Sequence, residues 1–271
     1  MELEAGNGMN RTMTAMNLFA SLLLLNLYYH QAQSDVAQGF DCSDIWDRNN
    51  AFTSGIYWIQ PKATTFSFQV FCEMSEGGGW TLMQRHDASD KLDFDRTWDE
   101  YKNGFGKLQG EHWLGLNYIY ALTQQTDRPA KLHISIGSFD GKEAYAEYNP
   151  FNVGNEDSSY KLSAGNYSGT AGDAFFGDPA IKGTNQYGSS FSTWDHPTDN
   201  CAGSCQFGDI MFNSCSEIVH SGWWFNACGS TNLNGIWRKP PRCIGYASSV
   251  LWPTWKVKES LKFSKMYLIH H

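Results

Sequence analysis

Seven cysteines limit the folds that are open to this chain. All of them lie after residue 41 and follow an apolar N-terminal stretch. That start, "NLFASLLLLNLYY" (17–29), follows Arg11 and precedes small residues, which is typical of a secretory signal peptide. We expect a signal peptide over 1–33 and a secreted, extracellular product. An uncleaved anchor is less favoured, because a membrane span needs about 20 apolar residues. Cysteines in that oxidising compartment form disulfides, and an odd number leaves one thiol over.

The close pair Cys201 and Cys205 also admits a zinc interpretation, since His196 lies nearby. No matching Cys/His pair accompanies it at zinc-ligand spacing. We therefore interpret the cysteines as bridges.

Residues 34–40 read as a short N-terminal segment and 41–271 as one domain. Aromatic residues make up 15% of the chain, and no Pro/Ser/Gly linker separates two apolar regions after residue 41. Such a composition supplies enough apolar surface for a single large core. We find no internal repeat.

The charge is acidic overall and basic at the end. A formal net charge of −8 argues against nucleic-acid binding, which needs a basic field to replace phosphate counterions. From residue 236 onward, however, seven Lys or Arg stand against one acid, Glu259, which gives about +6. This end is either a solvated face or a contact for an anionic proteoglycan.

Local patterns predict several elements. The runs "FSFQVFCEM" (66–74) and "GGWTLMQRH" (78–86) predict a hairpin across the turn residues between them. A second hairpin is expected in 131–151, where Asp140-Gly141 is a strong turn dipeptide. Segments 95–106 and 115–125 predict short helices. Beyond residue 165 periodicity fades into Gly, Asn, Asp and Ser, so we expect loops held by disulfides and aromatic anchors.

The stretch "STWDHPTDNC" (192–201) is half of an alternating acidic run. Asp195 and Asp199 lie four apart, and Pro197 occupies the position between them. Calcium takes six to eight oxygen ligands, and proline offers no side-chain oxygen. The same residues are ordinary turn chemistry. The stretch alone therefore leaves a partial calcium site and a simple turn as alternatives.

Six motifs, in order, resemble one known family. They are "EGGGWTLMQRH" (76–86), "GFGKLQGEHWLGLNYIYALT" (104–123), "GNYSGTAGDAF" (165–175), "FSTWD" (191–195), "SGWWFNACGSTNLNGIW" (221–237) and the closing "WPTW…SLKFSKMYLI" (252–269). The chain is similar over about 40–270 to the fibrinogen C-terminal domain. Within this family, "ACGSTNLNG" and the close cysteine pair resemble the angiopoietin and angiopoietin-related branch.

The resemblance implies an α+β fold with three subdomains, named A, B and P. B carries a central antiparallel sheet, and P is loop-rich and binds ligands. It also implies the bridges Cys42–Cys72 and Cys215–Cys228, which leaves Cys201–Cys205 as the third pair. In the family, the peptide before the binding-loop cysteine is often cis, here Ser214–Cys215.

The same resemblance bears on calcium. The family's calcium loop uses two carboxylates, which fall here on Pro197 and Asp199. The principal carboxylate is therefore missing, and Asp195 is a substitute two residues away. We expect a degraded or weakened calcium site on Asp195 and Asp199.

The ligand pocket implied by the resemblance also departs from the family. Fibrinogen's knob-peptide pocket has a Gln-Asp pair and a His where this chain has Ile218, Val219 and Gly229. Knob-peptide binding should be absent, and acetyl-sugar recognition of the ficolin type also relies on that His. The apolar walls remain, although core packing is their alternative role. The expected pocket comprises Ser214, Cys215, Ile218, Val219, Trp224, Phe225 and Gly229.

Two functions follow as hypotheses. The first is a secreted ligand of the angiopoietin-related kind that engages a cell-surface receptor or a matrix protein through the P subdomain. The second is a secreted lectin of the ficolin or tachylectin kind that recognises acetylated glycans. The substitutions at 218, 219 and 229 favour the first. No catalytic motif appears in the sequence, so an enzyme is not expected.

Two modifications are expected. "NYS" (166–168) is an acceptor for a glycan on Asn166. Cys243, in "RKPPRC", is the cysteine without a partner, and neighbouring cations favour its reactive thiolate. We expect either a disulfide-linked homodimer through Cys243 or a capped thiol. Most relatives carry a coiled-coil or collagen stalk, whereas fewer than ten residues separate the expected cleavage point from Asp41.

Overall fold

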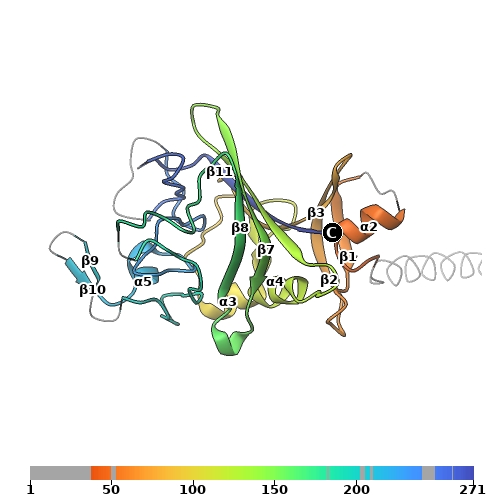
Figure 1. Ribbon diagram of the computed structural model, residues 1–271, viewed down its shortest axis with the longest axis horizontal. Coiled ribbons are helices and arrows are strands. Elements are labelled where there is room, and N and C mark those ends of the chain that lie inside the picture. The colour runs from red at the N-terminus through yellow and green to blue at the C-terminus, as the bar shows by residue number, and fades with distance from the viewer. Residues whose placement is uncertain are drawn as a thin grey trace, which may run out of the picture.

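A nine-stranded antiparallel sheet organises the molecule in the computed structural model (Figure 1). The structure describes residues 38–49, 53–181, 183–201, 205–207, 210–239, 248–257 and 259–271. The strand order of the sheet is β1-β2-β3-β11-β6-β7-β8; β5 also pairs with β3, and β4 pairs with β5. The strands are β1 (Gly55–Ile59), β2 (Phe68–Ser75), β3 (Gly78–His86), β4 (Phe105–Gly106), β5 (His112–Trp113), β6 (Ala130–Gly137), β7 (Glu143–Val153), β8 (Leu162–Gly169) and β11 (Phe263–His270).

Both predicted hairpins are confirmed. β2 pairs with β3 and β6 with β7, and the second turn contains Gly141 at φ 81°. Positive φ suits glycine, which explains the Asp-Gly signal. Alternation along β6 buries Leu132, Ile134 and Ile136 on one face of the sheet. The hairpins therefore set the register and direct one face to the core.

The last strand, β11, lies in the middle of the sheet. It pairs antiparallel with β3 on one side and with β6 on the other. Five consecutive residues, Met266–His270, are buried, so this strand shows no polar and apolar alternation. Its end reaches α2 (Cys42–Asn49), where the backbone N–H of His270 donates to Ser43 Oγ at 3.2 Å. The C-terminus thus closes against the start of the domain (Figure 1).

Two helices lie where the sequence predicts them. α3 (Trp98–Asn103) begins at a capping box, because Thr97 accepts from the N–H of Glu100 and Glu100 accepts from the N–H of Thr97. Such a box satisfies two amides that a helix start leaves free. α4 (Leu116–Thr123) buries Leu116, Ile119 and Leu122. A short 3-10 turn, η1 (Glu156–Ser158), follows β7.

The loop-rich P subdomain lies between β8 and β11, over residues 170–262. Its described regular elements are short: β9 (Cys205–Phe207), β10 (Ile210–Phe212) and α5 (Cys215–Val219). Aromatic packing replaces regular structure here. Phe191 packs against Trp224 at a ring distance of 5.1 Å, and Trp224 against Trp223 at 5.3 Å. The predicted loop region with aromatic anchors is therefore confirmed.

The described part of the chain contains three disulfides: Cys42–Cys72, Cys201–Cys205 and Cys215–Cys228. They are the three pairs named from the sequence. The first joins α2 to β2, and the others lie in the P subdomain. Cys243 and residues 1–33 lie outside the described residues.

One expectation needs correction. The peptide Ser214–Cys215 is not cis, and the cis peptide in the described chain is Asn149–Pro150. Ser214 is extended (φ −148°, ψ 136°) and leads directly into α5, so a trans bond fits the chain path. Residues 38–40, expected to precede the domain, already contact β1, because the Gln38 N–H donates to Trp58 O at 2.8 Å. In the described ranges, no helix is both long enough and apolar enough to cross a bilayer.

Candidate functional site

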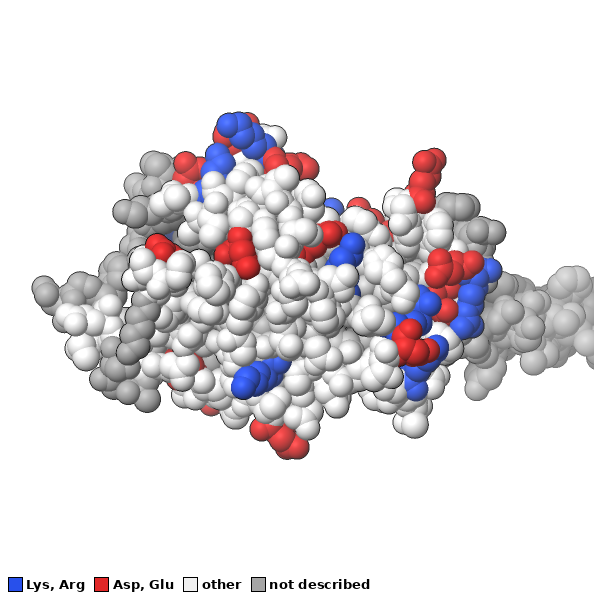
Figure 2. All heavy atoms as spheres, viewed as in Figure 1, with Lys and Arg blue, Asp and Glu red and all other residues white. Residues whose placement is uncertain are grey.

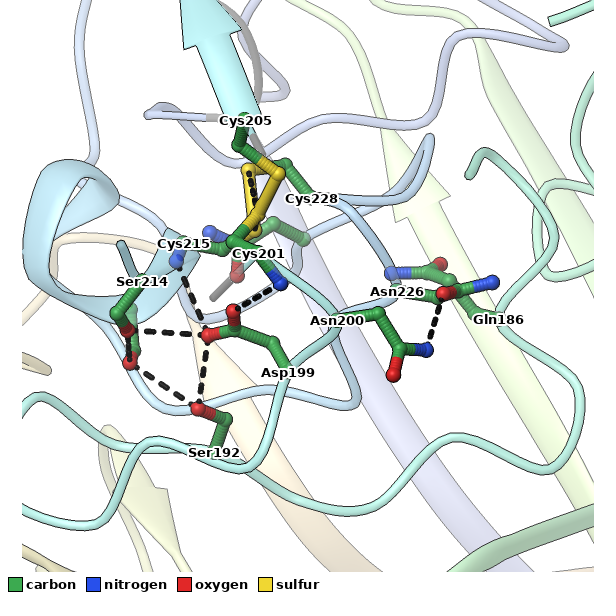
Figure 3. Close-up of a disulfide and its surroundings, with 12 residues drawn as sticks. Gln186, Ser192, Asp199, Asn200, Cys201, Cys205, Ser214, Cys215, Asn226 and Cys228 are labelled. Carbon is green, nitrogen blue, oxygen red and sulfur yellow. Dashed lines mark hydrogen bonds between the residues drawn. A yellow bond between two sulfur atoms is a disulfide. The ribbon is translucent and has the colours of Figure 1, made fainter. Parts of the chain in front are cut away.

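The expected binding loop meets the expected calcium loop at a cluster of four cysteines (Figure 3). The Sγ atoms of Cys201, Cys205, Cys215 and Cys228 all lie within 4.8 Å of one another, and all four residues are buried. Cys201 Sγ lies 3.0 Å from Cys215 Sγ and 3.9 Å from Cys228 Sγ. The two P-subdomain disulfides are therefore packed against each other.

Asp199 joins these segments through its carboxylate. Its Oδ2 accepts from Ser192 Oγ at 3.1 Å, Ser214 Oγ at 3.0 Å and the N–H of Cys215 at 3.0 Å. Its Oδ1 accepts from the N–H of Cys201 at 3.1 Å. Figure 3 shows the carboxylate directed toward these donors. Four donors thus engage the one carboxylate that matches the family's calcium loop.

Asp195 serves a different element. Its Oδ1 accepts from the N–H of Trp98 at 2.9 Å, the first residue of α3, and from Thr193 Oγ1 at 2.8 Å. Neither Asp195 nor Asp199 belongs to a group of three or more His, Cys, Asp or Glu side chains gathered in the described residues. Both carboxylates accept hydrogen bonds from other segments of the protein.

Most residues of the expected pocket are buried. Trp224 and Phe225 are at most 1% exposed, and Trp224 Nε1 donates to Tyr160 O at 2.8 Å. These rings pack in the core. Ser214, Cys215, Val219 and Gly229 are also buried, so the expected pocket residue that reaches solvent is Ile218, at 43% exposure.

Gln186 fills the space beside Gly229. A Cβ at position 229 would lie 2.2 Å from Gln186 Nε2, and Gly229 has φ +69°. The Gln186 amide is buried and donates to Thr231 O at 3.0 Å. This side chain occupies the volume into which a residue at 229 would project. The site therefore lacks both the family's His and the room for it.

Exposed apolar side chains concentrate in the P subdomain. Six of the nine large hydrophobic residues that are exposed in the described chain lie there: Phe176, Ile181, Trp194 (50%), Met211 (60%), Ile218 (43%) and Val257. Three of them sit on segments that Asp199 and the disulfides join, namely the 192–199 loop, the β9–β10 hairpin and α5. Figure 1 shows that hairpin and α5 at one end of the molecule. Burial is not visible in sequence, so Trp194 and Met211 were not identified there.

A second feature missed in the sequence lies beside a cavity of about 590 Å³ lined by residues that include His86, Glu111 and Trp237. Glu111 accepts from the N–H groups of Asp87, Ala88, Asp90 and Leu92, at 2.8–3.0 Å, and lies 2.8 Å from His86 Nδ1. Burial would raise the pKa of Glu111, but these hydrogen bonds outweigh it and lower the pKa to about 2. The carboxylate is thus the fixed centre of the 87–92 loop.

The basic end of the chain is partly neutralised. Lys256 Nζ lies 3.0 Å from Asp140 and 3.7 Å from Glu259, and Lys265 Nζ lies 3.9 Å from Glu73. On the face drawn in Figure 2, basic and acidic side chains are intermixed, with broad uncharged areas between them. The described residues on that face therefore form no continuous basic patch.

Asn166 is exposed on β8, the edge strand of the sheet. It pairs across from Asn149 of β7, which is also exposed. Solvent therefore reaches the acceptor amide.

Comparison with known proteins places these features in a family. Residues 38–271 match the family model described as fibrinogen beta and gamma chains, C-terminal globular domain. Fibrinogen-like protein 1 of Bos taurus is 41% identical over 223 residues, which are 79% of this chain and 66% of that protein. Angiopoietin-4 of Bos taurus is 38% identical over 213 residues, 78% of this chain and 39% of that protein.

The fold agrees with a solved relative. The fibrinogen-like globe domain of human ANGPTL2 superposes with a TM-score of 0.72 at 34% identity, covering 85% of this chain and 98% of that one. This chain spans about two thirds or less of the length of the two sequence relatives. The α+β fold, the antiparallel sheet and the disulfide-closed loops agree with this relationship. The chain belongs to the fibrinogen C-terminal domain family and fits its angiopoietin and angiopoietin-related branch.

Proposed function

We propose that this chain is a secreted extracellular binding module whose P subdomain engages a protein, either a cell-surface receptor or a matrix component. One observation carries the proposal: the expected small-ligand pocket is filled from within, while exposed apolar side chains lie on the segments that Asp199 and the disulfides join. A filled site offers little to an acetylated sugar, whereas Trp194, Met211 and Ile218 offer the apolar contacts typical of the centre of a protein interface. Binding rather than catalysis is the proposed activity.

Ile218 and Ile56 provide a matched test of this surface. Both are isoleucines on the surface, at 43% and 40% exposure, but Ile56 lies on β1, outside the P subdomain. We expect Ile218→Asp to weaken saturable binding of the labelled domain to responsive cells by about tenfold or more, since a lost interface anchor costs 2 kcal/mol or so. Ile56→Asp should bind like the wild type.

Two further measurements separate the alternatives. Equal losses for the Ile218 and Ile56 variants would contradict a P-subdomain interface. Acetyl-dependent binding on a glycan array would instead support the lectin. Soluble heparin that abolishes cell binding would point to an anionic proteoglycan through the basic end.

We also propose that calcium contributes little to this fold. Asp199 is already saturated by four internal donors, and Pro197 supplies no ligand. A site of millimolar affinity at millimolar calcium stabilises by only about 0.4 kcal/mol. Thermal unfolding in calcium and in chelator should therefore give melting temperatures within about 2 °C of each other. A larger rise with calcium would show that other oxygens rebuild the site.

A glycan on Asn166 is the expected modification of the secreted protein. The acceptor triplet is exposed on an edge strand, where a transferase can reach it. Treatment of secreted material with an N-glycosidase should lower its mass, and Asn166→Gln should remove that shift. An unchanged mass after treatment would contradict the assignment.

A further inference from the structure

The four cysteines of the P subdomain are close enough to exchange partners. Cys201 Sγ lies 3.0 Å from Cys215 Sγ, although the two belong to different disulfides, and all four sulfurs lie within 4.8 Å of one another. Thiol–disulfide exchange proceeds by attack of a thiolate on a neighbouring disulfide sulfur, so its rate depends on such access. The Cys42–Cys72 disulfide is outside this group.

We propose that this cluster is a thiol-exchange site, at which a small thiol of the glutathione class converts the pairs Cys201–Cys205 and Cys215–Cys228 into Cys201–Cys215 and Cys205–Cys228. Cys205 and Cys228 are 8% and 7% exposed, whereas Cys201 and Cys215 are fully buried, and we take Cys205 as the entry point because attack on it frees Cys201 beside Cys215. An incoming thiolate therefore meets Cys205 before Cys201 or Cys215.

The exchange runs in three steps that balance. The external thiolate attacks Cys205 Sγ, forms a mixed disulfide there and releases Cys201 as a thiolate. That thiolate attacks Cys215 Sγ, forming Cys201–Cys215 and releasing the thiolate of Cys228. Cys228 then attacks Cys205 Sγ, forms Cys205–Cys228 and expels the external thiolate. Two disulfides exist before and after, so the thiol acts as a catalyst and no oxidant is consumed.

The exchange would change what supports the proposed binding surface. Cys215 is the first residue of α5, and Ile218 lies one turn later on the same helix. In the native pairing α5 is tied to Cys228, beside Gly229 and Gln186. In the exchanged pairing it is tied to the 192–201 loop, which carries Trp194. The two pairings therefore attach α5, which carries Ile218, to different segments of the P subdomain.

Peptide mapping tests the proposal on the wild-type protein. Cleavage before Asp199 and Asp209 and after Glu217 separates fragments 199–208, 209–217 and one that begins at 218. The native pairing leaves the first fragment alone, with an internal disulfide, and joins the other two. The exchanged pairing joins all three. After incubation with glutathione and acid quenching, we expect the three-fragment species, with Cys42–Cys72 unchanged as the internal control.

A single variant tests the central step without an external thiol. Cys205→Ser leaves Cys201 reduced beside the Cys215–Cys228 bridge. We expect alkylation to label both Cys201 and Cys228, because Cys201 attacks Cys215 and frees Cys228. Within the four-cysteine cluster, label confined to Cys201, together with no three-fragment species from the wild type at any glutathione concentration that leaves Cys42–Cys72 intact, would overturn the proposal.

Discussion

Replacing Glu111 by glutamine is expected to lower the free energy of unfolding by about 3 kcal/mol at neutral pH. The lowered pKa of Glu111, about 2 against an ordinary 4.5, corresponds to roughly this free energy at 1.36 kcal/mol per pKa unit. Glutamine keeps the size of the side chain but loses the charge that four backbone N–H groups surround. Chemical denaturation of the two proteins measures the difference.

The pH dependence gives this prediction a second readout. Because the folded pKa of Glu111 lies below the unfolded value, its stabilisation is fully present above pH 4.5 or so and is lost as the pH falls toward 2. Glu111→Gln should lack that component of the acid transition. Glu143→Gln, at an exposed position of β7, is the matched control and should behave like the wild type. Equal stability of the Glu111 variant and the wild type would contradict the role assigned to the carboxylate.

Replacing Asp199 by asparagine is expected to destabilise the protein by about 3 kcal/mol. Hydrogen bonds to a charged acceptor contribute about 1.5–3 kcal/mol each, and the amide nitrogen of asparagine cannot accept from the donors now shared between the two oxygens. The loss should be the same in calcium and in chelator, because internal donors already hold the carboxylate.

An exposed aspartate provides the comparison. Asp157, in η1, is exposed, and Asp157→Asn should change the unfolding free energy by less than about 0.5 kcal/mol. Denaturation curves of both variants, recorded with and without calcium, decide the matter. A loss for Asp199→Asn that occurs only in calcium would show that the residue acts as a metal ligand instead.

Local signals made part of the fold predictable. The Asp140-Gly141 turn fixed one hairpin, and the Thr97–Glu100 spacing accompanied a helix, because each depends on residues adjacent in sequence. β11 gave no such signal. Its residues Met266–His270 are buried on both faces of the sheet, so its pattern lacks the alternation that reveals a half-exposed strand.

The site was harder to predict because its contacts are not local. Residue type identified Asp199 as a carboxylate, but its partners Ser192, Ser214 and Cys215 come together only in the fold. Trp224 was an apolar candidate for a pocket wall, and its burial decides in favour of the core. No sequence motif indicates that Glu111 accepts hydrogen bonds from the 87–92 loop, about twenty residues earlier. Such assignments require knowing which segments meet.

The central position of β11 determines the order in which the domain can assemble during synthesis. The β2–β3 and β6–β7 hairpins need only neighbouring residues and can form while the chain is still growing. β3 and β6, however, have no common partner until residues 263–270 have left the ribosome. Until then two half-sheets expose unpaired edges, and a stop codon at residue 262 would remove the strand that unites them. The eight residues of β11 therefore unite the two halves of the sheet, and the sheet can be completed only after β11 has been translated.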